Sequence, residues 1–374
     1  MGDRLRSVFV VIGTRPEAVK LSPVVRELRR RADRFAVTVC VTGQHQELLD
    51  QALLDCEIQA DLNLDVMRPD QDLASLTARL VTALDEAIGS IGPDIVLVQG
   101  DTTSAFCGAL AAYYRRTTVG HVEAGLRTGD KYAPFPEEGN RLLIRALADL
   151  HFAPTPLAAQ RLAAEGVEPH SVFMTGNTAV DALLRVRSRV RSSVPEGVVD
   201  LDASLGGGPL MAVTAHRREH FGSDLEEICG AVLDIVEQAS ELETVVPVHP
   251  NPKVRGPVHR MLGDHPRIRL VEPLPYEEFV WLMDRASLII TDSGGVQEEA
   301  PSLGTPVLVT RVATERPEGI SARNLIVGPN RPRIVREALR ILGSGAGGGG
   351  QSTHNPYGDG RAAIRIVNAL EVWT

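Results

Sequence analysis

The sequence alternates twice between runs rich in β-branched residues and helix-like segments, and this alternation restricts the fold more than any other feature. In the first series, SVFVVIG, FAVTVCVTG and PDIVLVQG are followed by helix-like residues 16–31, 46–54 and 103–114. The second series comprises PLMAVTAH, TVVPVHP, IRLVEPL, SLIITDSGG and TPVLVTR. Such βαβ repeats build parallel sheets. We predict an α/β protein of two doubly wound domains that face each other across a cleft, with ligands at the carboxyl ends of the strands.

The length of the chain and its glycine-rich stretches indicate where these domains meet. A chain of 374 residues fits two domains of about 150 residues or slightly more. The stretch SSVPEGVVDLDASLGGGP is typical of a surface loop near the start of the second domain, and the glycine-rich residues 343–351 precede a last amphipathic helix. We expect domains at 1–174 and 175–355, with the C-terminal helix 356–374 packed on the first.

Charge and cysteine usage exclude several classes of protein. The net charge is −9, and the basic residues are scattered, which argues against nucleic acid as a partner. No stretch approaches the ~20 apolar residues of a membrane span, and none resembles a signal peptide. The cysteines are widely spaced, which predicts reduced, mostly buried thiols and a cytoplasmic protein; they are Cys40, Cys56, Cys107 and Cys229.

Two strand-to-helix turns are suited to an anion. In GTRPEAVK, residues 13–20, Arg15 and Lys20 lie near a helix N-terminus, where negative charge is favoured, although a solvated basic pair is the alternative. In TDSGGVQEEA, residues 291–300, a Ser-Gly-Gly turn leads into a helix, so phosphate oxygens can approach the backbone. Glu299 could accept from ribose hydroxyls, and a plain helix cap is the alternative. Arg316, in TERPEG, follows the next strand and could contact the same phosphate.

The segment HRREH, residues 216–220, matches the H-x-x-E-H zinc pattern. Zinc ligands in this pattern need a helix, yet LMAVTA before it is strand-like, and two arginines oppose a dication. We therefore expect no metal and favour a phosphate-facing His216 with Arg217 or Arg218, while an exposed structural histidine stays open. His249, at another strand end, suits a cleft or a turn equally.

Three acidic residues follow neighbouring strands. Asp101 in VQGDTTS starts a helix, where a simple N-cap is the alternative, and Glu123 in GHVEAGLR ends the next strand. Both point to the same edge of the predicted sheet, and the PFPEE loop could bring Glu137 over them. These carboxylates are candidates for acid–base chemistry.

Taken together, these stretches resemble the bacterial non-hydrolysing UDP-N-acetylglucosamine 2-epimerase family, in order and over nearly the whole chain. The matching segments include GTRPEAVKLSPVV, GDTTS, GHVEAGLRTGDKYAPFPEEGNR, TGNTAVDAL, HRRE, DSGGVQEEAPSLGTPVL, TERPE and NPYGDG. The resemblance implies two Rossmann-like halves in the arrangement of nucleotide-sugar glycosyltransferases (GT-B-like), UDP held mainly by the second half, no cofactor, and a homodimer.

The resemblance also carries residue roles onto matching positions. The nucleotide contacts fall on Arg15, Leu274 and Phe279 near the uracil or its surroundings, Ser293, Gly294 and Gly295 on the diphosphate, Glu299 on the ribose, and Arg316. Lys20, Asp101, Glu123 and His216 match substrate-site positions, and Glu137 matches a proposed catalytic acid.

The implied reaction explains the loop carboxylates. The hydrogen on sugar C2 is not beside a carbonyl, so UDP must leave first; the resulting oxocarbenium-like ring acidifies C2, and a carboxylate can then remove the proton. We expect Glu123 and Glu137 to serve opposite faces of the sugar with help from Asp101. Crowded carboxylates should also have spread pKa values, with at least one protonated near neutrality.

Several alternatives and departures accompany this reading. A hydrolysing relative would release N-acetylmannosamine, a glycosyltransferase would need an acceptor, and a catalytically silent protein would only bind a UDP-sugar. Relatives activated by their own substrate suggest an activator site at Gln44, Arg217 and His249, but Glu47 and Asp70 replace residues typical of it, which argues against activation. Surface-polysaccharide and amino-sugar natural-product pathways would both suit the product.

Overall fold

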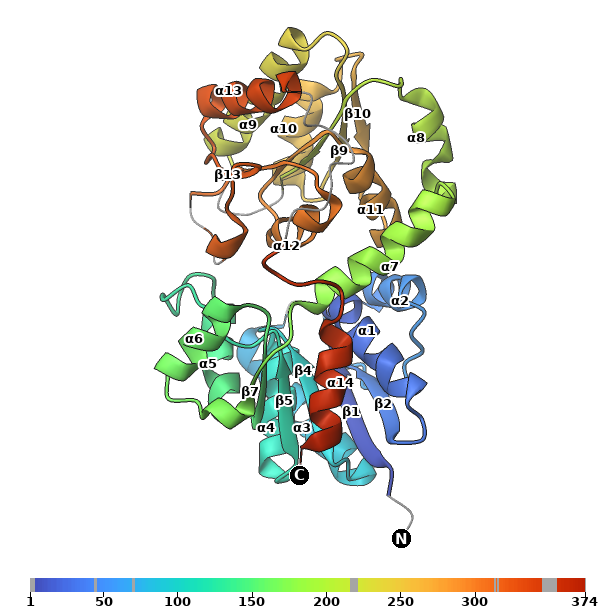
Figure 1. Ribbon diagram of the computed structural model, residues 1–374, viewed down its shortest axis with the longest axis vertical. Coiled ribbons are helices and arrows are strands. Elements are labelled where there is room, and N and C mark those ends of the chain that lie inside the picture. Colours follow the sequence, from blue (N-terminus) through green and yellow to red (C-terminus); the bar gives the residue numbers. More distant parts are fainter. Residues whose placement is uncertain are drawn as a thin grey trace. The chain divides into compact units, whose positions relative to one another are not determined.

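The computed structural model describes residues 4–43, 46–68, 71–215, 221–312, 314, 316–344 and 355–373. Internal contacts divide the chain into two compact units, Met1–Ala182 with Tyr357–Thr374, and Leu183–Pro356 (Figure 1). The domain limits expected from the sequence, as limits of independently folding parts, stay a prediction. Each unit is an α/β structure with its own parallel sheet.

Within the described residues, the first unit has a seven-stranded sheet in the order β3-β2-β1-β4-β5-β6-β7. All its strand pairs are parallel. The strands are β1 (Arg6–Ile12), β2 (Phe35–Val41), β3 (Leu62–Asn63), β4 (Ile95–Gln99), β5 (Thr118–Val122), β6 (Leu150–Ala153) and β7 (Val172–Met174). The helices are α1 (Arg15–Arg30), α2 (Gln46–Asp55), α3 (Leu73–Ile91), α4 (Thr103–Tyr114), α5 (Glu137–Leu147), α6 (Pro156–Ala164), η1 (Pro169–Ser171) and α14 (Ala362–Val372). The strand order reverses between β1 and β4, the point where such sheets bind ligands.

The second unit repeats this order, with a six-stranded parallel sheet arranged β10-β9-β8-β11-β12-β13 in the part of the chain that is described. Its strands are β8 (Leu210–Thr214), β9 (Glu243–Pro247), β10 (Ile268–Val271), β11 (Leu288–Thr291), β12 (Val307–Val309) and β13 (Asn324–Ile326). Its helices are η2 (Glu196–Val198), α8 (Val199–Ser204), α9 (Ser223–Gln238), α10 (Pro252–Leu262), α11 (Tyr276–Arg285), α12 (Gly294–Leu303), η4 (Pro317–Gly319) and α13 (Arg331–Gly343). The order reverses between β8 and β11.

The central strands are apolar because both faces of each sheet are covered by helices. The five residues of β4, IVLVQ, are all buried, as are the last five of β1. The four cysteines are buried and unpaired, as expected. Burial raises the pKa of the Cys40, Cys107 and Cys229 thiols to about 12, so these three are inert apolar packing.

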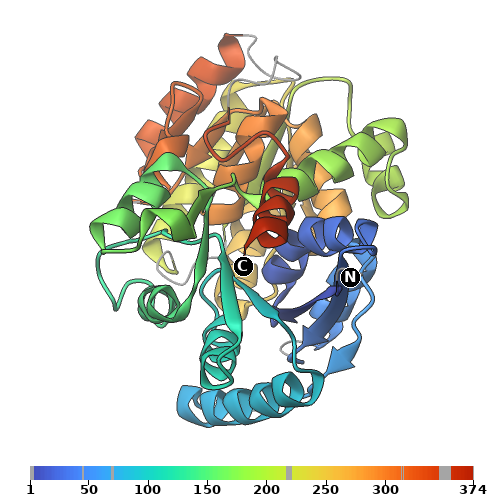
Figure 2. The same ribbon diagram turned by 60° about the horizontal axis from the view of Figure 1, so that its bottom comes forward.

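Helix α7 (Thr178–Ser192) contains the division between the units, and α14 returns to the first unit. Asp181 accepts hydrogen bonds from the Ala362 and Ala363 amides at 3.1 and 2.9 Å, at the start of α14. The same helix packs against α1, although the two are distant in sequence (Figures 1 and 2). Two carboxylate contacts to free helix amides therefore fasten the C-terminal helix to the first unit.

One local expectation needs correction. The stretch after α7 was expected to be a surface loop, but it contains η2 and the short helix α8. Asp200 and Asp202 lie in the first turn of α8, where acidic side chains favour a helix N-terminus. The remaining glycines, residues 206–208, follow the helix as irregular chain.

Candidate active site

The predicted acidic residues of the first unit lie at the carboxyl edge of its sheet. Arg15 is the first residue of α1, directly after β1. Asp101 follows β4, and Glu123 follows β5. Since β1 and β4 flank the point where the strand order reverses, these side chains occupy the edge at which open α/β sheets bind ligands.

Glu123 is buried and held by two donors. Its Oε2 lies 2.6 Å from Lys20 Nζ, and Gln99 Nε2 donates to the same oxygen. Its backbone has φ +68°, which non-glycine residues rarely adopt and which often marks functional sites. The Lys20 side chain is only 12% exposed, so it is not the solvated cation that the sequence left open. The pair connects helix α1, which follows β1, to the end of β5, and β4 lies between these two strands.

Asp101 is oriented by groups on α5. Arg141 donates from Nε and Nη2 to Asp101 Oδ2 at 2.9 and 2.6 Å, and Asn140 Nδ2 donates to the Asp101 carbonyl at 2.8 Å. The Asp101 carboxylate is 27% exposed. The carboxylate is thus held by Arg141 and still partly accessible to solvent. Asp101 is not the N-cap of α4, because Thr102 is the N-cap residue.

Glu137 begins α5 and is half-buried. Its Oε2 is buried and has no hydrogen-bond partner within the described residues. The next residue, Glu138, is fully engaged: it accepts from Arg141 Nη1 at 2.7 Å and from the Thr128 and Gly129 amides at 3.1 and 3.2 Å. A buried carboxyl oxygen without a partner is costly unless a ligand supplies one, which makes Glu137 the more ligand-ready of the two.

Glu17 is a buried carboxyl that sequence reasoning missed. It accepts from the Gly13 amide at 3.1 Å and from the Thr14 and Thr102 hydroxyls at 2.7 and 2.8 Å. Burial raises its pKa to about 7. The signal was present in the sequence, because a threonine followed three residues later by glutamate is the pattern of a capping box. Glu17 thus connects the turn between β1 and α1, which leads to Arg15, with the turn between β4 and α4, which contains Asp101.

The Ser-Gly-Gly turn of the second unit caps α12, with Ser293 at the N-cap position after β11. A Cβ added to Gly294 would lie 2.8 Å from Arg316 Nη1, so only glycine lets the guanidinium approach this closely. Arg316 Nε in turn donates to the buried Glu298 at 2.6 Å. The structure thus brings together Gly294 and Arg316, two of the residues predicted to contact phosphate, beside Ser293 and Gly295 at the same helix N-terminus.

The predicted ribose and uracil positions lie around α11 and α12. Glu299 is buried on α12, and its Oε1 accepts from the Tyr276 hydroxyl at 2.9 Å. Leu274 lies just before α11 and Phe279 lies within it, both half-buried. Tyr276 therefore orients Glu299, the residue predicted to contact the ribose. Sequence reasoning did not select Tyr276.

Other predicted positions fall outside this set. His216, Arg217 and Gln44 lie outside the described residues, as do the H-x-x-E-H segment and Asp70. His249 is exposed after β9, and its Nδ1 accepts from the Asn251 amide at 3.2 Å. Among the described residues, no group of three or more histidine, cysteine, aspartate or glutamate side chains could hold a metal ion.

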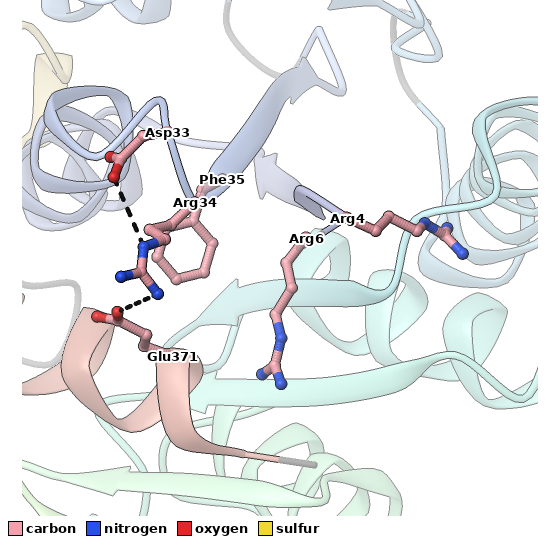
Figure 3. Close-up of a pocket in the computed structure, with 6 residues that line it drawn as sticks. All are labelled: Arg4, Arg6, Asp33, Arg34, Phe35 and Glu371. Atoms are coloured by element: carbon pink, nitrogen blue, oxygen red, sulfur yellow. Dashed lines mark ion pairs between the residues drawn. The ribbon is translucent and has the colours of Figure 1, made fainter. Parts of the chain in front are cut away.

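A cavity of about 260 Å³ opens at the opposite edge of the first sheet. Figure 3 shows its lining residues, Arg4, Arg6, Asp33, Arg34, Phe35 and Glu371. The Arg34 guanidinium lies 3.3 Å from Glu371 and 3.5 Å from Asp33. Because this cavity lies at the amino ends of β1 and β2 and contains none of the predicted site residues, it is not the candidate active site.

The comparisons with known proteins show the family to which the chain belongs. The family model for UDP-N-acetylglucosamine 2-epimerase matches residues 26–371. The chain is 48% identical to the UDP-N-acetylglucosamine 2-epimerase of Escherichia coli, over 97% of this chain and 98% of that protein. It is 46% identical to the enzyme of the same name from Bacillus subtilis, over 97% and 94%.

A solved structure shows the same likeness in three dimensions. The UDP-GlcNAc 2-epimerase of Neisseria meningitidis bound to UDP-GlcNAc superposes with a TM-score of 0.89 at 39% identity, covering 97% of this chain and 99% of that one. The match therefore spans both Rossmann-like units rather than one of them. This chain belongs to the UDP-N-acetylglucosamine 2-epimerase family.

Proposed function

We propose that this protein is an isomerase that interconverts UDP-N-acetylglucosamine and UDP-N-acetylmannosamine. The observation that carries the proposal is the family match over nearly the whole chain, together with two sheets whose carboxyl edges bear complementary chemistry. One edge presents acids at Asp101, Glu123 and Glu137, and the other presents a glycine turn with Arg316. Acids suit a developing ring cation, and amides with a guanidinium suit a leaving diphosphate.

The reaction begins with the bond between sugar C1 and the UDP oxygen. As this bond breaks, both of its electrons go to UDP and the ring becomes oxocarbenium-like, which acidifies the C2 hydrogen. A carboxylate takes that proton, leaving 2-acetamidoglucal and UDP bound. Proton delivery to the opposite face of C2 and return of the UDP oxygen to C1 complete the epimerisation, so atoms and charge balance.

Glu123 and Glu137 serve the two faces of C2, and Asp101 assists. Lys20 and Gln99 both donate to Glu123 Oε2, which fixes the orientation of this carboxylate. Glu137 has a buried oxygen without a partner among the described residues, which a sugar hydroxyl or C2 proton would satisfy. His216, which lies outside the described residues, stays a predicted substrate-site residue.

The nucleotide binds the second unit. Ser293, Gly294 and Gly295 present helix amides to the diphosphate, with Arg316 alongside, and Glu299 accepts from the ribose. Leu274 and Phe279 flank the uracil, and Arg15, on α1 of the first unit, is a further predicted nucleotide contact. UDP-GlcNAc bound in the Neisseria meningitidis relative supports this substrate class.

Proton NMR in heavy water tests the proposal. UDP-N-acetylglucosamine incubated with the protein in ²H₂O should yield UDP-N-acetylmannosamine, with solvent deuterium at C2 of both sugars, because the removed proton exchanges before return. Free N-acetylmannosamine with equimolar UDP would instead identify the hydrolysing reaction. Unchanged, unlabelled substrate would mean a binding protein, and product without deuterium would exclude elimination.

Assembly and regulation complete the proposal. The family resemblance supports a cytoplasmic homodimer, which light scattering on the purified protein would test. In the described part of the chain no helix has the length and apolar character needed to cross a membrane. The activator site at Gln44, Arg217 and His249 stays a prediction, tested by whether added UDP-N-acetylglucosamine accelerates the reverse reaction.

A further inference from the structure

Arg141 is a buried cation on α5 that joins two separate acidic groups. Its side chain is 6% exposed, and a guanidinium this deeply buried is costly unless carboxylates pair with it. Two of its donors reach Asp101, after β4, and a third reaches Glu138, on its own helix. All three distances lie between 2.6 and 2.9 Å, the range of charge-assisted hydrogen bonds.

The contact with Asp101 is one-sided. Both Nε and Nη2 of Arg141 approach Oδ2, so Oδ1 lies outside this contact. The backbone beside it is also fixed: Asn140 holds the Asp101 carbonyl, and His121 Nε2 lies 2.7 Å from the Gly100 carbonyl. Arg141 therefore fixes the Asp101 carboxylate through one of its two oxygens.

The contact with Glu138 extends the network to a loop. The Glu138 side chain is 2% exposed, and its other oxygen accepts from the Thr128 and Gly129 amides. Those residues begin the loop that runs to Glu137, the first residue of α5. Arg141 thereby links the turn that carries Asp101 to both ends of the loop that precedes Glu137.

We propose that Arg141 is a positioning residue, whose guanidinium orients Asp101 and, through Glu138, holds the 128–136 loop that places Glu137. This inference rests on the proposed function. This role requires a planar guanidinium, because its three donors point in different directions and reach two carboxylates at once. A lysine ammonium keeps the charge but is a compact point charge that cannot reproduce this geometry.

Steady-state kinetics of Arg141→Lys test the geometric requirement. Misplacing a catalytic group by about 1 Å can cost on the order of 100-fold in rate, so kcat should fall about 10- to 100-fold while KM changes less than about 3-fold. Arg115→Lys is the matched control. Arg115 caps the opposite end of α4 and also pairs with an aspartate through Nε and Nη2, which contact the two oxygens of Asp85 at 2.7 and 2.6 Å, and its replacement should leave both constants unchanged.

Chemical rescue separates positioning from a general packing role. Guanidinium chloride at millimolar concentration should partly restore the activity of Arg141→Ala and should not affect the wild type.

Glu138→Gln keeps the test valid if the arginine variants do not fold. It retains an acceptor for the loop amides but loses the charge that Arg141 requires, and a kcat loss with an unchanged KM is expected. If Arg141→Lys, or Glu138→Gln in its place, keeps kcat within about 2-fold of the wild type, the inference is overturned. A wild type that neither epimerises nor exchanges C2 hydrogen would instead overturn the proposed function.

Discussion

Tyr276 donates its hydroxyl hydrogen to Glu299 Oε1 at 2.9 Å, and both residues are buried in the second unit. This contact orients the Glu299 carboxylate, which we propose as the ribose contact. A hydrogen bond to a charged group contributes about 1.5–3 kcal/mol. The orientation of Glu299 should therefore depend on Tyr276.

We expect Tyr276→Phe to raise KM for UDP-N-acetylglucosamine about 10-fold or more, with kcat changed less than about 3-fold, since the ribose contact is made in ground state and transition state alike. Initial-rate kinetics measure both constants. Tyr113→Phe is the control, because Tyr113 is exposed and lies on the far end of α4. An unchanged KM in Tyr276→Phe would contradict the ribose assignment of Glu299.

At the scale of elements, α14 depends on a carboxylate from α7. Asp181 accepts from the Ala362 and Ala363 amides, which have no partner inside their own helix. Burial raises the pKa of Asp181 to about 6, so the carboxylate stays charged at neutral pH and weakens only in acid. The terminal helix is otherwise held by its apolar face, including the fully buried Ile366 and Leu370.

Asp181→Ala should therefore loosen the start of α14 without unfolding the unit. We expect hydrogen–deuterium exchange of the first-turn α14 amides to accelerate about 10-fold at pH 7.5, equivalent to ~1.4 kcal/mol for the lost cap. Asp359→Ala is the control, because Asp359 lies near the same helix start but pairs with the Arg365 side chain in an exposed position. Exchange in Asp181→Ala as slow as in the wild type would mean that apolar packing alone holds α14.

At the scale of the whole molecule, buried ionisable groups set the pH range of stability. Burial lowers the pKa of His121 to about 3 and of His151 to about 4, and these two residues are paired neighbours on β5 and β6. An unfolded histidine takes up a proton below its usual pKa of about 6.5, whereas these remain neutral in the folded state. Their contribution to stability is thus complete above about pH 6.5 and is lost as the pH falls.

We predict that His121 lowers the free energy of unfolding by about 2 kcal/mol between pH 7.5 and 5, and that His121→Gln removes this contribution. Glu17, whose pKa is raised to about 7, acts in the opposite direction and stabilises the fold as the pH falls through 7. The measurement is urea denaturation followed by Trp373 fluorescence in a Trp281→Phe background, because each unit contains one of the two tryptophans. A pH dependence identical in both proteins would be inconsistent with a neutral, buried His121.

The architecture and the strand-end residues could be predicted because they depend on local pattern. Apolar runs such as IVLVQ indicate a strand that is buried on both faces of a sheet. The Ser-Gly-Gly turn before α12 indicates a backbone that a neighbouring group or a ligand approaches closely. The positions of Asp101, Glu123 and Ser293 could be predicted in the same way, because each residue follows a strand and the carboxyl ends of parallel strands lie at one edge of their sheet. Short-range features also misled: the glycine-rich context after α7 concealed the helix α8.

The residues that sequence reasoning missed all act across long distances in the chain. Arg141 meets Asp101 forty positions away, Tyr276 meets Glu299 twenty-three away, and Glu17 meets Thr102 eighty-five away. The amino-acid sequence by itself determined the strands, the turns and the candidate acids, because those follow from periodicity and backbone freedom. Only the tertiary structure decided which side chain supports each acid, since a hydrogen bond between distant residues depends on how the packed helices and strands bring them together.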